Sequence, residues 1–135
     1  MSAWVLPLAL LPLILSSCGG TWVDDDRNFN RVFGFGKPDD VKTIHSYYWK
    51  SPHWSVEYRY FIALRASPSF LSGLTRNMME VSLDRRVLTS CGDKPPQWFL
   101  PKPLSNYDAW IPKDSGYYIF RDRADGTLFL SDERL

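Results

Sequence analysis

An alternation of side chains along residues 54–65 limits what this chain can fold into more than any other feature of its sequence. One face receives the apolar and aromatic residues Trp54, Val56, Tyr58, Tyr60, Ile62 and Leu64. The other face receives Ser55, Glu57, Arg59 and Arg65, together with Phe61 and Ala63. Because successive side chains of a β-strand point to opposite faces, this period of two predicts a long, half-buried strand. Residues 41–50 are rich in β-branched and aromatic side chains and predict a neighbouring strand. The turn residues Ser51-Pro52-His53 between the two segments favour an antiparallel hairpin.

A helix is predicted directly after this hairpin. Ser67 followed by Pro68 is a typical helix start, with serine as the N-cap and proline at the first helical position. Apolar residues then recur at helical spacing over residues 68–77. Residues 79–88 fit neither period well, and we favour a strand there because Val81 and Leu83 alternate.

The C-terminal end predicts a second hairpin. Residues 117–122 and 127–131 both alternate in the manner of strands. Gly126, in the short connection between them, can adopt the left-handed conformation that a tight turn requires.

Five prolines and two tryptophans fall within residues 94–112. Proline lacks the N–H that helices and sheet ladders use, so this density predicts a surface strap and excludes a central strand. Trp98 and Trp110 are candidate binding residues, because functional side chains concentrate in irregular segments. The aromatic residues of the chain as a whole fit two roles, either plain core packing or a stacking surface for glycan or peptide.

These elements predict an α+β fold for residues 41–135, with a small antiparallel sheet of four to five strands and one short helix packed on one face. The chain is 44% hydrophobic and 16% aromatic, which is typical of one compact domain and not of a disordered segment. Its 16 basic and 15 acidic residues nearly cancel, and no basic run exceeds two. That pattern argues against a nucleic-acid partner.

The N-terminus begins with an uncharged apolar run over residues 4–15. A membrane-spanning helix needs about 20 apolar residues, so this run is too short to cross a bilayer, and Pro7 and Pro12 interrupt it. Its length is that of the hydrophobic core of a secretory signal peptide. A buried apolar strand and an uncleaved anchor are the alternatives.

The motif that follows, Leu15-Ser16-Ser17-Cys18, resembles the lipobox of bacterial lipoproteins. The resemblance implies that residues 1–17 are a signal peptide, that cleavage precedes Cys18, and that Cys18 carries the lipid. Three acyl chains on one residue would anchor the protein stably, since one chain alone binds a membrane only marginally. Gly19 in place of an aspartate implies sorting to the outer membrane, on its periplasmic face, in a Gram-negative cell. Residues 18–40, rich in glycine and aspartate, are then expected to form a spacer.

Lipidation of Cys18 would leave Cys91 without a partner in its own chain. An odd cysteine in an oxidising compartment is buried and inert, paired with another chain, or reactive. Without lipidation, a Cys18–Cys91 disulfide becomes an alternative.

The sequence contains no recognisable catalytic constellation, and it predicts neither a cofactor nor a metal site. The two histidines, His45 and His53, lack the spacing of a zinc site. We therefore expect a membrane-anchored envelope lipoprotein that acts as a non-catalytic binding or protective module, with an envelope protein (a toxin included) or peptidoglycan as its partner. The alternative is a small periplasmic hydrolase or thiol enzyme that uses His45, His53 or Cys91.

Overall fold

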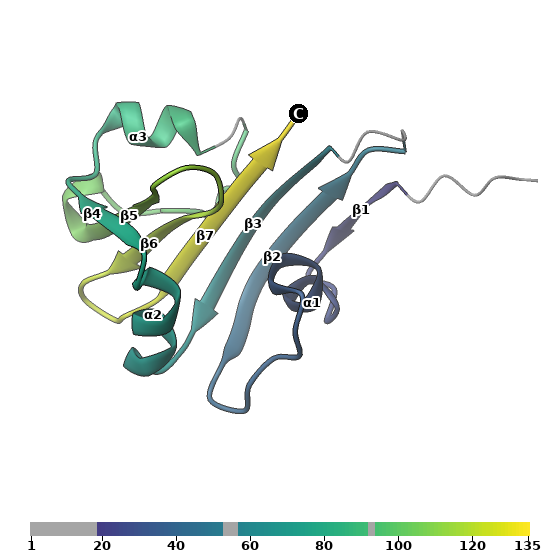
Figure 1. Ribbon diagram of the computed structural model, residues 1–135, viewed down its shortest axis with the longest axis horizontal. Helices are drawn as coiled ribbons and strands as arrows, with labels where there is room; N and C mark the ends of the chain where they lie inside the picture. The colour runs from purple at the N-terminus through teal and green to yellow at the C-terminus, as the bar shows by residue number, and fades with distance from the viewer. Residues whose placement is uncertain (1–18, 53–56, 92–93) are drawn as a thin grey trace, which may run out of the picture.

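The computed structural model describes residues 19–52, 57–91 and 94–135. Within these residues the chain forms one seven-stranded sheet and three short α-helices (Figure 1). The strands are β1 (Gly20–Val23), β2 (Lys42–Lys50), β3 (Tyr58–Arg65), β4 (Met78–Val81), β5 (Tyr107–Pro112), β6 (Tyr118–Asp122) and β7 (Leu128–Arg134). The helices are α1 (Asn28–Phe33), α2 (Pro68–Thr75) and α3 (Arg85–Ser90), with a 3-10 turn, η1, at Leu104–Asn106.

The strand order in the sheet is β1-β2-β3-β7-β6-β5-β4, and every neighbouring pair is antiparallel. The first three strands, β1, β2 and β3, are neighbours in the sheet. After α2 the chain forms β4 at the opposite edge, and β5, β6 and β7 then follow in order back toward β3. The last strand, β7, therefore pairs with β3 at the centre, where Ile62 faces Leu130. This closure joins the two predicted hairpins into one sheet.

Both faces of the sheet are covered by apolar packing. On one face, α1 and α2 lie over a core that includes Ile62, Leu64, Ile119 and Leu130, and Figure 1 shows α1 in front of β2. On the opposite face, α3 and residues 94–106 cover a second core. Its buried members are Phe61, Ala63, Cys91, Phe99, Tyr107, Ala109, Phe120 and Phe129. The central strands consequently separate two cores.

The expected α+β fold, with a sheet of four to five strands and one short helix, was wrong. The sheet has seven strands and dominates the described structure, and three short α-helices accompany it. The half-buried character expected for residues 54–65 was wrong as well, at least for β3. Phe61 and Ala63 lie on the face expected to meet solvent, yet they are only 1% and 2% exposed. A second layer of the fold buries them. This agrees with the continuous apolar run of residues 60–64, because strands covered on both faces carry apolar side chains at successive positions. Residues 53–56 of the predicted strand lie outside the described residues.

Several local predictions are confirmed. Ser67 is the N-cap of α2, and its side chain accepts a hydrogen bond from the backbone N–H of Phe70, with Pro68 opening the helix. The strand expected at residues 41–50 is β2, and the C-terminal hairpin is β6 and β7. Gly126 lies in the turn of that hairpin with φ of 77°.

Two segments differ from their predictions. Residues 79–88, expected as a strand, divide into the end of β4 and the start of α3, whose N-cap Asp84 accepts hydrogen bonds from two backbone N–H groups. Residues 94–112 were expected to exclude a central strand, yet β5 lies between β4 and β6. The reason is local: residues 107–111 contain no proline, and Pro112 occupies only the end of the strand.

The segment expected as a spacer, residues 18–40, contributes β1 and α1 to the fold. β1 pairs with β2 from Gly20 to Val23, and α1 buries Phe29 in the core that α1 and α2 cover, together with Ile62 and Leu130. Among the described helices, none has the length and apolar character that crossing a membrane demands.

Candidate functional site

Of the residues singled out from the sequence, Cys18 and His53 lie outside the described residues. Cys91 follows α3 and is buried, at 3% exposure. Its thiol donates a hydrogen bond to the backbone carbonyl of Val87 at 3.0 Å, and burial raises the pKa of the thiol to about 12. At neutral pH the thiolate, which is the nucleophilic form, is therefore scarcely populated.

An apolar cavity of about 380 Å³ adjoins Cys91, between α3, residues 95–104 and the sheet. Phe61, Leu88 and Phe99 contribute to its walls. The cavity brings no acid or imidazole to the thiol, so these surroundings favour the buried, inert role among those open to Cys91.

His45 lies in β2 with its side chain exposed, and it contacts one acid and one aromatic ring. Its Nδ1 is 3.6 Å from a carboxylate oxygen of Asp24, which is too long for a hydrogen bond. Its ring stacks on Trp98, with centroids 5.2 Å apart and planes inclined by 22°. His45 and Cys91 thus have separate surroundings. The described residues also contain no group of three or more histidine, cysteine or acidic side chains suited to hold a metal ion.

The two candidate tryptophans belong to opposite faces of the sheet. Trp98 is partly buried and packs against the core beneath α3 and residues 94–106. Trp110, in β5, is partly buried against the core on the α1 and α2 face, with the Arg121 guanidinium 5.3 Å from its ring centroid. Because the sheet separates them, Trp98 and Trp110 cannot form one continuous binding surface.

Trp98 instead borders an uncovered part of the sheet. On its face, α3 and residues 94–106 pack over β3, β7, β6 and β5, whereas β1 and the adjoining part of β2 extend beyond this cover. Alternation and register place Thr21, Val23, His45 and Tyr47 on this same face. We call these four residues and Trp98 the β1 shelf. Val23 is 63% exposed, an unusual fraction for an apolar strand residue.

The β1 shelf ends at an open sheet edge. The backbone N–H of Asp24 donates to the carbonyl of Ser46 at 2.8 Å, which makes Asp24 and Ser46 a hydrogen-bonded pair. Because such pairs alternate in an antiparallel ladder, Trp22 and Gly20 also direct their backbone groups toward β2. Thr21 and Val23 therefore direct their N–H and C=O groups outward, where no strand of the described chain pairs with them.

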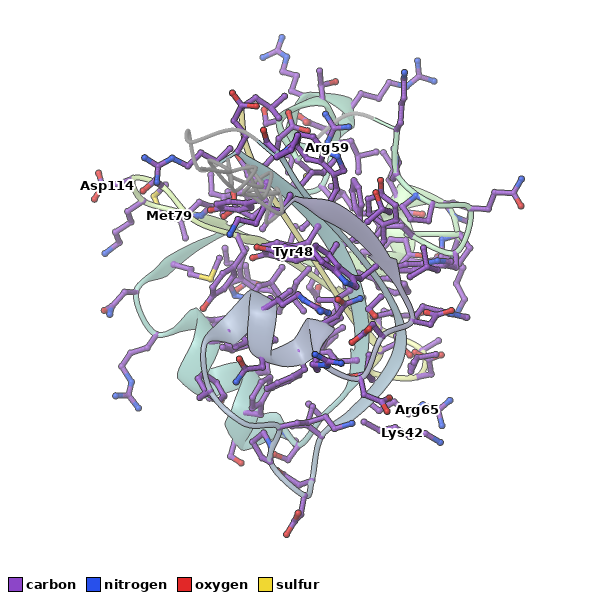
Figure 2. The ribbon with its side chains drawn as sticks, turned by 90° about the vertical axis from the view of Figure 1, so that its right-hand side faces the viewer. Lys42, Tyr48, Arg59, Arg65, Met79 and Asp114 are labelled. Atoms are coloured by element: carbon purple, nitrogen blue, oxygen red, sulfur yellow. The ribbon has the colours of Figure 1, made fainter. Side chains whose placement is uncertain are left out.

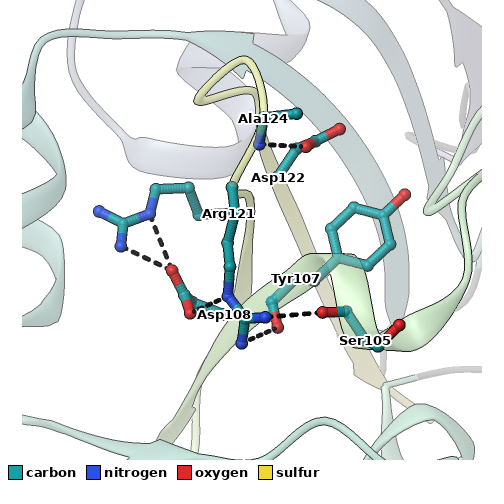
Figure 3. Close-up of polar contacts among 7 residues, drawn as sticks. Ser105, Tyr107, Asp108, Arg121, Asp122 and Ala124 are labelled. Carbon is teal, nitrogen blue, oxygen red and sulfur yellow. Dashed lines mark hydrogen bonds and ion pairs between the residues drawn. The ribbon is translucent and has the colours of Figure 1, made fainter.

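A cavity of about 450 Å³ beside the start of α2 is the other candidate, and Asp108, Arg121 and Arg123 contribute to its walls. Figure 3 shows the Asp108 carboxylate between the two guanidinium groups. Arg121 approaches it at 2.6 Å and Arg123 at 2.8 Å, and hydrogen bonds from Arg123 and Arg121 lower the pKa of Asp108. Arg123 also donates to the backbone carbonyl of Ser105 at 2.6 Å. Both cations are thus engaged in joining η1 and β5 to β6, which is a structural role.

The open edge is not evident from the sequence, because the glycine- and aspartate-rich composition of residues 18–40 indicates a spacer. Thr21, Trp22 and Val23 all have high β-propensity, and this was the one indication of this strand in the sequence. Because β1 has only four residues, it is too short for an alternating pattern to be recognised. In the described structure the exposed edge strand β1 therefore lies beside the stacked rings of His45 and Trp98, two of the candidate residues from the sequence. Comparisons of the chain with protein-family models, with curated proteins and with solved structures found no match.

Proposed function

We propose that this protein is a lipid-anchored component of a bacterial cell envelope, and that the β1 shelf binds an extended segment of a partner protein without catalysing a reaction. Cys18 is the lipidated residue in this proposal, and residues 1–17 are its signal peptide. Gly19 directs the protein to the periplasmic face of the outer membrane in a Gram-negative cell.

The position of β1 supports the anchor. The sheet begins at Gly20, two residues after Cys18, so a lipid on Cys18 would lie next to the folded domain.

The observation that carries the binding role is the open edge of β1. Outward N–H and C=O groups on Thr21 and Val23 are the groups to which an extended peptide adds as a further strand. Side chains of that peptide would lie next to Thr21 and Val23 of β1, with the aromatic ring of Tyr47 on β2 one strand further in. Aromatic residues contribute much of the energy of such contacts. Peptidoglycan offers no repeating amide ladder of this kind, so the geometry favours a protein partner.

The anchor is tested by growing cells with radiolabelled palmitate. The wild-type protein should incorporate the label, and Cys18→Ser should not. Label retained by Cys18→Ser would contradict lipidation at Cys18.

Strand addition is tested by photo-crosslinking from position 21 in intact cells. We expect the crosslink to capture one discrete envelope protein. Val23→Pro should reduce the yield of that product roughly tenfold, because proline has no outward N–H to donate to an added strand and its ring obstructs the approach of that strand. The unfolding free energy should change by less than about 1 kcal/mol, because that N–H makes no bond within the sheet.

Val23→Thr is the matched control, because it keeps the N–H and the β-branched shape, and it should crosslink like the wild type. Crosslinks to peptidoglycan fragments alone, or crosslinks unaffected by Val23→Pro, would refute strand addition.

A further inference from the structure

The residue after the proposed lipid attachment site is packed tightly into the fold. A Cβ placed on Gly19 would lie 2.6 Å from the Cα of Pro52 and 2.7 Å from the carbonyl carbon of Ser51. Carbon atoms in contact normally lie about 3.5–4.0 Å apart, so no side chain fits at position 19 without movement of the backbone. Gly19 is therefore held against the end of β2, and this packing requires glycine whatever sorting role the residue also has.

Because Gly19 is packed in the fold and Cys18 directly precedes it, no linker residue separates a lipid on Cys18 from the folded domain. Consecutive Cα atoms are about 3.8 Å apart, so Cys18 must lie within about 4 Å of Gly19. The acyl chains of a lipidated Cys18 enter the hydrocarbon from the level of the headgroups. The end of the sheet that contains Gly19 is thus confined to the membrane surface.

Figure 1 shows which end this is, because β1 starts where β2 finishes and where the C-terminus of the chain lies. The register aligns four residues across the sheet here, with Gly20 facing Lys50, Lys50 facing Tyr58, and Tyr58 facing Arg134. Figure 2 shows the Arg59 end of the molecule opposite the end that carries Lys42 and Arg65. The two ends of β2 are therefore clearly separated.

The side chains of the aligned residues Lys50, Tyr58 and Arg134 suit the headgroup region of a bilayer. Lys and Arg side chains reach phosphate groups, and tyrosine rings are enriched where apolar and wet environments meet. Two acids at this end have partners: Asp132 accepts a hydrogen bond from the Tyr58 hydroxyl at 2.9 Å, and Glu133 forms an ion pair with Arg59. Lys50 and Arg134 form no ion pair within the described residues, which leaves both cations available to phosphate.

We propose that the end of the sheet formed by Gly19, Lys50, Pro52, Tyr58 and Arg134 rests on the phospholipid headgroups, with the strands leading away from the bilayer. This orientation rests on the proposed lipidation of Cys18. It also restricts the partner, because Val23 is three residues from Gly20 and thus lies within about 10 Å of that end along the strand. The segment that binds the β1 shelf then belongs to a region of its protein close to the membrane.

The orientation is tested with the full-length lipidated protein in phosphatidylcholine vesicles that contain nitroxide-labelled lipid. A fluorescent thiol label is introduced by Lys50→Cys, and in a matched variant by Lys42→Cys at the opposite end of the same strand. These positions are eight residues apart, or about 26 Å along the strand. The buried Cys91 is replaced by alanine in both variants to prevent background labelling.

We expect the nitroxide lipid to quench the Lys50→Cys label at least about threefold more than the Lys42→Cys label, because contact quenching does not extend over such a distance. Equal quenching, or stronger quenching at position 42, would overturn the orientation. Flotation with the vesicles and palmitate incorporation report separately on the anchor. A protein that floats and carries palmitate but shows equal quenching would refute only the orientation, whereas one that does neither would refute the proposed function.

Discussion

Asn28 in α1 and Ser46 in β2 share a hydrogen bond in which the amide group is fully buried. The amide nitrogen of Asn28 donates to the Ser46 hydroxyl at 2.9 Å and to the backbone carbonyl of Trp22 at 3.0 Å. Arg31 completes the arrangement by donating to the amide oxygen at 2.7 Å. One side chain thereby joins β1, α1 and β2, and it makes the expected spacer part of the domain.

We expect Asn28→Ala to lower the free energy of unfolding by about 2 kcal/mol, because it leaves buried acceptors without their donor. Urea denaturation followed by tryptophan fluorescence measures the change. Asn30→Ala, an exposed position in the same helix, is the control and should be neutral or slightly stabilising, since alanine has the higher helix propensity. Equal effects of the two substitutions would contradict the role given to Asn28.

Asp108 should make stability depend on pH. Hydrogen bonds from Arg123 and Arg121 hold its pKa below the usual value, so its contribution is present above about pH 4 and is lost as pH falls through the lowered pKa. We expect Asp108→Asn to cost about 1 kcal/mol at pH 7, a modest figure because both guanidinium groups are exposed to solvent. Denaturation series at pH 7 and pH 3 should show the difference from wild type shrinking at the lower pH. Asp26→Asn, at an exposed position, serves as the comparison. If Asp108→Asn costs no more at pH 7 than Asp26→Asn, the stabilising role given to the contacts of Asp108 with Arg121 and Arg123 is wrong.

Cys91 should be unreactive in the folded protein. Burial raises the pKa of its thiol to about 12, so Ellman's reagent at pH 8 should react slowly with the native protein and rapidly after unfolding in urea. Rapid modification of the native protein would revive the thiol-enzyme alternative and argue against an inert role.

Gly34 and Gly36 provide a matched pair, because a Cβ at either position would meet nothing within 4 Å. Gly34 ends α1 with φ of 76°, a conformation that costs an L-residue about 1–2 kcal/mol, so Gly34→Ala should destabilise by that amount. Gly36 lacks a positive φ, so Gly36→Ala should be neutral or stabilise by up to about 1 kcal/mol. Thermal denaturation should separate the two, and equal midpoints would be inconsistent with the described turn.

Features that depend on neighbouring residues alone could be predicted from the sequence. Ser67 and Pro68 begin α2 because a hydroxyl acceptor and a preset φ act within one turn of helix. Gly126 marks the β6–β7 turn for a similar reason, since only its own backbone conformation is involved. The candidate site is predictable only in part: the sequence identifies Trp98 and His45 as separate candidates, and nothing in it indicates that their rings stack.

Features that depend on distant partners could not be predicted in this way. β5 follows a proline-rich segment and became a central strand because β4 and β6 supply its hydrogen bonds from both sides. The strand edge of β1 depends likewise on β2, whose paired residues lie 24 to 30 positions further along the chain, from Val23–Tyr47 to Gly20–Lys50.

By itself, the sequence determined that residues 58–65 form a strand, where α2 starts and where the C-terminal hairpin turns, because each follows from backbone preferences over a few residues. Only the tertiary structure decided which segments cover the two faces of β3, that Trp98 and Trp110 lie on opposite sides of the sheet, and that Gly19 packs against Pro52. Each of these depends on segments far apart in the chain, whose contacts stabilise the fold only once the whole sheet has closed.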